Sequence, residues 1–278
     1  GEQGETGGGP HDGEAGQLEP DGLGGRTFAD DDIQGEIFHR RVEHFFHHAT
    51  QPVNYIDKED ITLFIALGTH RPNTPAELLA MLGEDALAYR IVQNNAFDLA
   101  TQVCLGPTQA GHDIWLNAEL AACPVKILTG FIEPHFFAGF SGGPKAVLPG
   151  IAGGSSILYN HRPVNIDHPG ATWGVTDGNP VWEEMAEAAR MARVDFLLNV
   201  TLDPKKRITG VFAGHPETAH RSGCAHVRTH AMAAVDAPFD IVISSNSGYP
   251  LDQNLYQAVK GMSAAAQITA YGGSIIMA

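Results

Sequence analysis

Three short segments carry the residues with the clearest chemical potential, and each follows a predicted strand. The first comes directly after the apolar run 60–67 and contains His70. The second is the glycine- and phenylalanine-rich stretch 130–150, and the third comprises His161 together with residues 256–260. Open α/β sheets bind ligands beyond the carboxyl ends of their strands, so we expect these segments to face a binding crevice. For His70, a turn histidine hydrogen-bonded to the backbone is the alternative interpretation.

The stretch 130–150 has the composition of an anion-binding loop. Its glycines, among them Gly142 and Gly143, allow backbone N–H groups to approach an anion closely, and Ser141 adds a donor. Lys145 is then a phosphate contact, or a nucleophilic amine if desolvation lowers its pKa. The stretch is not a Walker A motif, because no Lys-Ser/Thr pair follows at the required spacing. A flexible surface loop is the alternative, but four interleaved phenylalanines argue against it.

Two further patterns are weaker. Gln257 and Lys260 lie three positions apart and would share one face of a helix, where an amide and a lysine charge would grip a substrate carboxylate. An ordinary solvated helix end is the alternative. His44, His47 and His48 also have helical spacing, but no carboxylate motif such as HExxH accompanies them, so an exposed helix face is favoured over a metal site.

Apolar periodicity and turn residues predict an α/β protein with a mostly parallel sheet. Predicted strands cover residues 60–67, 90–93, 125–129, 196–202, 208–212, 239–244 and 273–277. Predicted helices cover residues 36–49, 75–82, 181–192, 217–233 and 254–266. Thr74, Pro75 and Glu77 form an N-terminal capping signature for the second of these helices.

Composition divides the chain into three parts. Residues 1–32 are acidic and glycine-rich and are predicted to be disordered or irregular. Residues 33–235 are predicted to form an N-terminal domain. Residues 236–278 then begin a second α/β domain that is cut short, because a helix ends near Ala234 and a fresh βαβ unit follows.

Charge and composition exclude several classes of protein. Lys and Arg number 17 against 32 Asp and Glu, a formal charge of −15, which argues against a nucleic-acid binder and against a polybasic membrane anchor. No apolar run approaches the length of a transmembrane helix. The three cysteines are far apart and odd in number, which excludes a disulfide scaffold and predicts a cytoplasmic protein.

Several runs together resemble the nickel-pincer lactate racemase family. They are IALGTHRP, IEPHFFAGFSGGPKAVLPG, the Asn160-His161 pair, VFAGHPETAHRSGC and GYPLDQNLYQAVK, and the resemblance extends from about Ile56 to the C-terminus. It implies a nickel-pincer nucleotide, a pyridinium mononucleotide with two sulfur arms, joined to Lys145 as a thioamide. It also implies that His161 is a nickel ligand and that His70 and His135 are the acid/base pair. Tyr256, Gln257 and Lys260 would then hold the substrate.

The reaction implied by this resemblance is racemisation or epimerisation of a small-molecule 2-hydroxy acid such as lactate. Removing hydride from the α-carbon leaves a planar keto acid, to which hydride returns on either face. A histidine of near-neutral pKa takes the hydroxyl proton, and two enantiomers require two histidines. Ser141, Gly142 and Gly143 are expected to contact the cofactor phosphate, with Arg71 as a further anion contact. Cofactor-biosynthesis proteins are the implied partners.

Three departures from the family pattern stand beside the resemblance. The family carries an Asp-x-Thr-Arg-Pro motif, for which Asp32 is the nearest candidate here, and the arginine is absent. The acidic block replaces a strand–helix segment, and the C-terminal domain is cut after about 40 residues. A non-catalytic or degenerate member that binds the cofactor without turnover is therefore an alternative. A mononuclear metal hydrolase is a third, although no general-base carboxylate stands at motif spacing.

Overall fold

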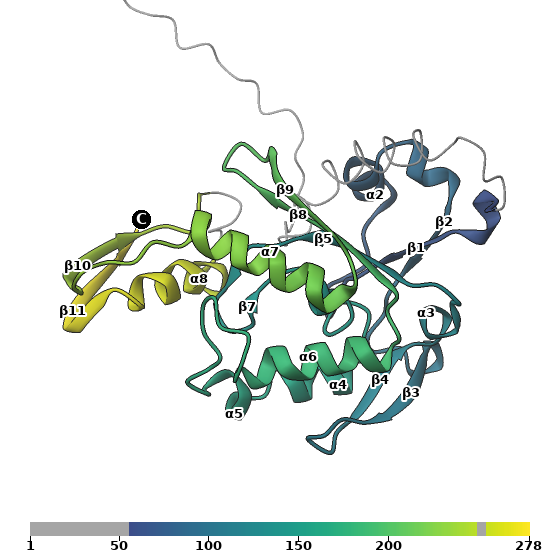
Figure 1. Cartoon of the computed structure of the whole chain (residues 1–278), viewed down its shortest axis with the longest axis horizontal. Coiled ribbons are helices and arrows are strands. Elements are labelled where there is room, and N and C mark those ends of the chain that lie inside the picture. Colours follow the sequence, from purple (N-terminus) through teal and green to yellow (C-terminus); the bar gives the residue numbers. More distant parts are fainter. Residues whose placement is uncertain (1–55, 249–253) are drawn as a thin grey trace, which may run out of the picture.

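Strands and helices alternate through most of the structure, a computed structural model that describes residues 56–248 and 254–278 (Figure 1). The strands are β1 (Thr62–Ile65), β2 (Arg90–Gln93), β3 (Gln102–Pro107), β4 (Asp113–Asn117), β5 (Ile127–Phe131), β6 (Pro134–His135), β7 (Gly139–Phe140), β8 (Phe196–Leu202), β9 (Ile208–Gly214), β10 (Phe239–Ser244) and β11 (Thr269–Met277). The α-helices are α2 (Pro75–Leu82), α3 (Ala118–Ala122), α4 (Gly154–Asn160), α5 (Pro163–Ile166), α6 (Pro180–Met191), α7 (Pro216–Ala231) and α8 (Leu255–Ala266). Short 3₁₀ helices are η1 (Lys58–Asp60), η2 (Asp85–Ala88), η3 (Leu99–Thr101) and η4 (Gly143–Ala146).

The central sheet has the strand order β5-β8-β9. Strand β5 pairs with β8 in parallel, with Gly130 opposite Asn199, and β8 pairs with β9 in antiparallel. The predicted pairing of the two segments 196–202 and 208–212 is thus confirmed. Parallel pairs also join β1 to β2 and β10 to β11, whereas β3–β4 and β6–β7 are antiparallel. The predicted mixed α/β class is confirmed, with antiparallel hairpins beside the parallel pairs.

Helices α6 and α7 pack against the η4 segment of the loop that follows β5. Helix α7 packs against β8 and β9 (Figure 1). Helix α6 packs against η4. Helix α6 begins at Asn179, whose side chain accepts hydrogen bonds from the N–H groups of Val181 and Trp182 and so caps the helix. Both helices therefore contact the η4 segment, since α7 also packs against it.

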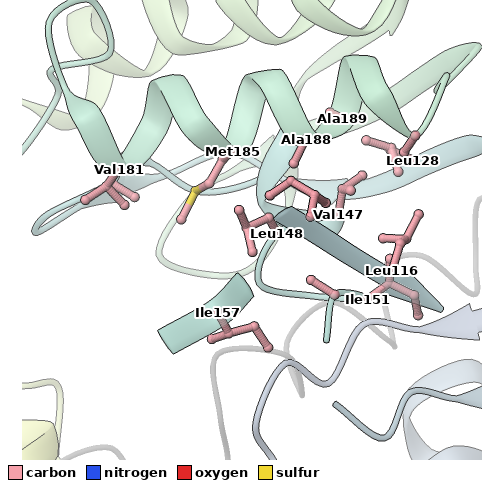
Figure 2. Packing of buried hydrophobic residues seen from close by; sticks show 14 of the residues in the cluster. Leu116, Leu128, Val147, Leu148, Ile151, Ile157, Val181, Met185, Ala188 and Ala189 are labelled. Atoms are coloured by element: carbon pink, nitrogen blue, oxygen red, sulfur yellow. The ribbon is translucent and has the colours of Figure 1, made fainter. Parts of the chain in front are cut away.

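The main hydrophobic core lies beneath the same segment (Figure 2). Val147 and Leu148, which follow η4 directly, are completely buried and join Met185 of α6 and Leu197 of β8 in one cluster. Burying each of these side chains stabilises the fold by about 1.5–3 kcal/mol. The chain just after Lys145 is therefore fixed to the most buried part of the protein.

Truncating Leu197 is expected to show how much this core contributes to the free energy of unfolding. Leu197→Ala removes a side chain with 0% exposure, so we expect the free energy of unfolding to fall by about 2–5 kcal/mol. Leu158→Ala is the matched control, because Leu158 is 65% exposed and its loss should change the free energy by no more than about 0.5 kcal/mol. Urea unfolding followed by circular dichroism measures both, and equal midpoints for the two variants would contradict the packing described here.

Most predicted elements have counterparts, and some predictions lie outside the described residues. The strands at 90–93 and 239–244 match β2 and β10, whereas the strand expected at 60–67 is shorter, because Asp60 ends η1. The capping signature at α2 is confirmed, since Thr74 and Glu77 exchange side-chain-to-backbone hydrogen bonds. The segment 1–32 and the helix 36–49 lie outside the described residues, and the boundary near residue 235 remains a prediction.

Two composition-based expectations can also be compared with the structure. None of the helices in residues 56–248 and 254–278 is both long and apolar enough to cross a membrane. Cys104, Cys123 and Cys224 are all free thiols. Of the three, Cys224 is buried in α7, and burial raises the pKa of its thiol to about 12.

Candidate active site

The stretch 130–150 is an ordered loop built from two tight turns. Pro134–His135 of β6 pairs with Gly139–Phe140 of β7, which forms a small hairpin after β5. Gly139 has a φ of +78°, and a Cβ there would lie 2.1 Å from the carbonyl oxygen of Val175, so only glycine fits. Phe140 is buried at the end of the hairpin. The phenylalanines thus anchor the loop, and η4 follows with Lys145 in its single turn.

His135 sits in this hairpin with its ring held by aromatic and backbone contacts. The ring centroid lies 4.9 Å from that of Phe136 and 4.7 Å from that of Phe137. Its Nδ1 accepts a hydrogen bond of 3.1 Å from the N–H of Ala138, so the neutral ring carries its proton on Nε2. Burial holds the pKa of His135 well below its usual range, and the charges of Lys145 and Lys260 lower it further. His135 is therefore neutral at pH 7.

His161 follows the last residue of α4 and shows the opposite tautomer. Its Nδ1 lies 3.2 Å from the carbonyl oxygen of Ile157, which only accepts, so Nδ1 carries the proton and Nε2 keeps its lone pair. The ring packs edge-on against Phe137 at 5.1 Å between centroids. Burial and the charge of Lys145 lower the pKa of His161 to about 4. A neutral imidazole with a free Nε2 lone pair is the form that binds a metal ion.

Electrostatic coupling shows which charged groups meet at the two imidazoles. The Lys145 ammonium lowers the pKa of both His135 and His161, and the Lys260 ammonium lowers that of His135. Lys260 arrives on α8, which is tied to the rest of the protein by a 3.1 Å hydrogen bond from Trp173 Nε1 to Ser263 Oγ. The Phe137 ring contacts both the His135 and the His161 rings, so these two predicted site residues lie in one region, within reach of the Lys145 charge. Two positive charges beside two neutral rings form a site suited to anions.

His70 and Arg71 occupy the turn after β1. His70 is exposed, and its N–H donates to the carbonyl oxygen of Leu67 at 3.0 Å. The turn is joined to the loop described above, because the Gly68 N–H donates to the Gly150 carbonyl oxygen at 2.8 Å. Arg71 forms a two-pronged ion pair with Glu77 at 2.6 and 2.9 Å, which lowers the pKa of that carboxyl to about 2. The guanidinium thus braces the start of α2, and its predicted anion contact remains a prediction.

The predicted anion donors of the loop point into the protein. Ser141 Oγ accepts from the Glu133 N–H and donates to the Phe131 carbonyl oxygen. The Gly143 N–H donates to Asn199 Oδ1 at 2.8 Å. Gly142 has a φ of +72°, and a Cβ there would lie 2.6 Å from the Phe131 carbonyl oxygen. The glycines are therefore explained by close packing of the turn, and phosphate binding by these residues remains a prediction.

The remaining predicted residues are only partly visible. Asp32 lies outside the described residues. Gln257 is half-buried near the start of α8, and its N–H donates to the side chain of Asn254, which caps the helix. Tyr256 belongs to the same helix, but its side chain is not among those described.

Sequence reasoning missed two buried polar residues that support the site and assigned no contact to a third, Asn160, which it noted only as the neighbour of His161. Asn199 of β8 and His220 of α7 hydrogen-bond to the turn that precedes Lys145. Asn160, directly before His161, donates from Nδ2 to Glu184 Oε2 at 2.9 Å and to the Val181 carbonyl oxygen at 3.0 Å. The sequence offered two signals for these residues, the run VFAGHPETAHRSGC, which contains His220, and the Asn160-His161 pair, but no signal for Asn199.

The coupling between Lys145 and His135 can be tested directly. Lys145→Gln removes a positive charge beside the ring. Loss of this repulsion stabilises the imidazolium, so we expect the pKa of His135 to rise. Burial still opposes the charged form, so the pKa stays below its usual value. NMR titration of the ring protons measures the shift. His168→Gln is the control, because the exposed His168 lies outside the site, and an unchanged His135 titration in Lys145→Gln would contradict the proximity of the two groups.

The fold is that of an α/β protein, and the lysine and histidine residues form a candidate ligand site. Comparisons with known proteins give the family. The model of the lactate racemase N-terminal domain matches residues 41–174, and that of the lactate racemase C-terminal domain matches residues 234–278. The lactate racemase of Lactiplantibacillus plantarum is 46% identical over 219 residues, and that of Thermoanaerobacterium thermosaccharolyticum is 43% identical over 221 residues. The chain belongs to the lactate racemase family.

Coverage and structural likeness qualify this relationship. The two matches cover 78% and 79% of this chain but 51% of each relative, so the chain spans about half the length of the curated relatives it matches. The structure of the lactate racemase apoprotein from T. thermosaccharolyticum aligns with a TM-score of 0.82 at 38% identity, covering 89% of this chain and 58% of that chain. A Thermotoga maritima protein at 19% identity has a TM-score of 0.63, covers 79% of this chain and 58% of that one, and shares the fold.

Proposed function

We propose that this chain is the cofactor-binding part of a racemase or epimerase that interconverts the stereoisomers of a lactate-like 2-hydroxy acid. The observation that carries the proposal is the gathering of Lys145, Lys260, His135 and His161 in one site, in a chain of the lactate racemase family. Two cations suit an anionic substrate and an anionic cofactor. Two neutral imidazoles suit metal binding and proton transfer at neutral pH.

The residues present fit a nickel-pincer nucleotide. His161 offers an unprotonated Nε2, and its Nδ1–H is fixed by the carbonyl oxygen of Ile157. No group of three or more His, Cys, Asp or Glu side chains that could hold a metal occurs among residues 56–248 and 254–278, so a metal at His161 needs donors from a bound group. Sulfur donors with one imidazole suit nickel. Lys145 is close enough to affect the pKa of His161 and is the proposed point of attachment.

Each proposed site residue then has a defined task. When bound, the cofactor supplies an acceptor for the hydride of the α-carbon. Lys260, with Gln257 and Tyr256, holds the substrate carboxylate. His135 takes the hydroxyl proton for one enantiomer and His70 for the other. To accept a proton at Nε2, the His135 ring must hold its own proton on Nδ1, so the hydrogen bond from the Ala138 N–H is released when substrate binds.

The partners and the compartment follow from the cofactor and the cysteines. A tethered nucleotide requires proteins that make and deliver it, so we propose cofactor-biosynthesis proteins as partners. Three free cysteines fit a reducing cytoplasm. The acidic chain carries no expectation of nucleic-acid binding.

The proposal is tested on the full-length gene product co-expressed with cofactor-making proteins. We expect a mass adduct that is absent from Lys145→Ala, and interconversion of D- and L-lactate or of another 2-hydroxy acid measured by chiral chromatography. An adduct without interconversion of any 2-hydroxy acid supports the non-catalytic alternative instead. An adduct that persists in Lys145→Ala would remove the proposed attachment.

A further inference from the structure

His220 is a completely buried histidine that the proposed reaction does not use. It lies in the second turn of α7 with 1% exposure, and its ring is stacked near Trp182. Its Nε2 lies 2.9 Å from the carbonyl oxygen of Ser141, four residues before Lys145. A buried imidazole is costly unless its nitrogens are satisfied, so its contacts need an explanation.

The partners of His220 fix its tautomer. The Ser141 carbonyl oxygen only accepts, so Nε2 carries the proton and donates it. Cys224 Sγ lies 3.6 Å from Nδ1 and 3.7 Å from Nε2, so the sulfur lies against the ring and does not change this assignment. Burial raises the pKa of the Cys224 thiol to about 12, so the sulfur keeps its hydrogen. The imidazole therefore acts as a neutral donor aimed at the turn that leads to Lys145.

A second side chain holds the same turn. Asn199 of β8 is completely buried, and its Oδ1 accepts the Gly143 N–H at 2.8 Å. The contact with His220 is also close in space, since a Cβ on Gly143 would lie 2.5 Å from His220 Cδ2. The His220 ring therefore leaves room for only glycine at position 143, while Asn199 holds the N–H of the same residue.

The opposite end of the turn is fixed by the core. Val147 and Leu148 are completely buried directly after Lys145, and the Lys145 carbonyl oxygen accepts from the Gly150 N–H at 3.1 Å. Lys145 thus stands between a polar clamp on one side and a hydrophobic anchor on the other. Its long side chain has many rotamers, so a fixed backbone narrows the positions that the amine can reach.

We propose that His220, together with Asn199, is a positioning residue for Lys145. The hydrogen bond from His220 Nε2 to the Ser141 carbonyl oxygen holds the turn so that the lysine amine stands in the histidine site. The role in cofactor attachment rests on the proposed function, whereas the positioning of the amine belongs to the protein alone. His220 touches neither the substrate nor the reacting atoms in this proposal.

The experiment measures the reactivity of the Lys145 amine in the full chain without cofactor. Acetic anhydride at limiting dose labels lysines, and peptide mass spectrometry gives the rate at Lys145 relative to the exposed Lys205 and Lys206. In His220→Leu the turn is released, and we expect Lys145 to be labelled about three- to tenfold faster, the effect of losing one net hydrogen bond. In His220→Gln the amide donates in place of Nε2 and should restore the wild-type rate.

Controls separate positioning from general destabilisation. Cys224→Ala removes the other partner of His220 but leaves the bond to Ser141, so it should keep the wild-type labelling rate. If His220→Leu does not fold, Asn199→Ala removes the second tie and should accelerate labelling in the same way. Unchanged labelling of Lys145 in these variants, or a His220→Gln rate equal to that of His220→Leu, would overturn the proposal. The labelling rates do not depend on racemase activity. Failure of this positioning proposal is therefore distinguishable from failure of the proposed function.

Discussion

Replacing His161 with alanine is expected to remove nickel from the cofactor-loaded protein and to lower racemase activity by roughly 10³-fold or more, the loss of several kcal/mol of metal assistance. The expected effect is large because the described part of the protein contains no group of three metal-binding side chains that could replace the lost ligand. A pKa of about 4 keeps the ring neutral, and its Nδ1–H bond to Ile157 directs the Nε2 lone pair outward from the backbone.

Metal analysis of purified full-length protein, alongside the racemase assay, measures this result. His168→Ala is the matched control, because His168 is exposed and follows the same helical region without sharing the site. It should retain metal and activity. Full nickel content in His161→Ala would mean that the metal is held elsewhere, and the proposed assignment of His161 would then be wrong.

Local sequence patterns predicted those elements whose residues alone favour them. The strand at 239–244 is rich in Ile, Val and Phe, and the helix at 75–82 has a complete capping box, so both match β10 and α2. Helix α4 was missed because it begins Gly154-Ser-Ser, a sequence of poor helix formers. Tertiary contacts hold it instead, since Ser156 Oγ bonds to both Trp115 and Asp113 on β4.

The candidate site was predictable only in the members that carry chemistry themselves. His135, Lys145 and His161 stand in unusual sequence surroundings at strand or helix ends, where chemistry is expected. His220 lies within a helix among ordinary helix residues, and its partner Ser141 lies 79 positions away. The interpretation of Gly143 as an open anion cradle had the same limitation, because the side chain that takes its N–H comes from β8. Long-range partners leave no mark in a local pattern.

The charges at the site change when the proposed ligands bind. Besides burial, the ammonium groups of Lys145 and Lys260 lower the pKa of His135. Attachment as a thioamide removes the charge of Lys145, and a substrate carboxylate offsets that of Lys260. Each of these two changes, taken alone, favours the imidazolium form of His135. In the bare site, burial and the two ammonium groups keep the ring neutral.

His135→Gln is accordingly expected to lower racemisation by about 10²–10⁴-fold, the usual contribution of a positioned acid or base. The loss must be equal in both directions, because the two enantiomers have equal free energy and kcat/KM is constrained by that equilibrium. The role of His135 is nevertheless one-sided. Formation of keto acid in a single turnover should be slow from one enantiomer and close to the wild-type rate from the other.

His70→Gln supplies the matched comparison, because it should show the reverse preference in the single-turnover experiment. His70 is exposed in its turn and His135 is partly buried in a hairpin, so the two substitutions alter different faces of the proposed site. Rapid-quench measurement of keto acid from each pure enantiomer distinguishes them. If both variants slow the same enantiomer, the two histidines serve one face. Racemisation by one base on each side of the substrate is then excluded, because return of hydride to the opposite face would have no partner for the proton.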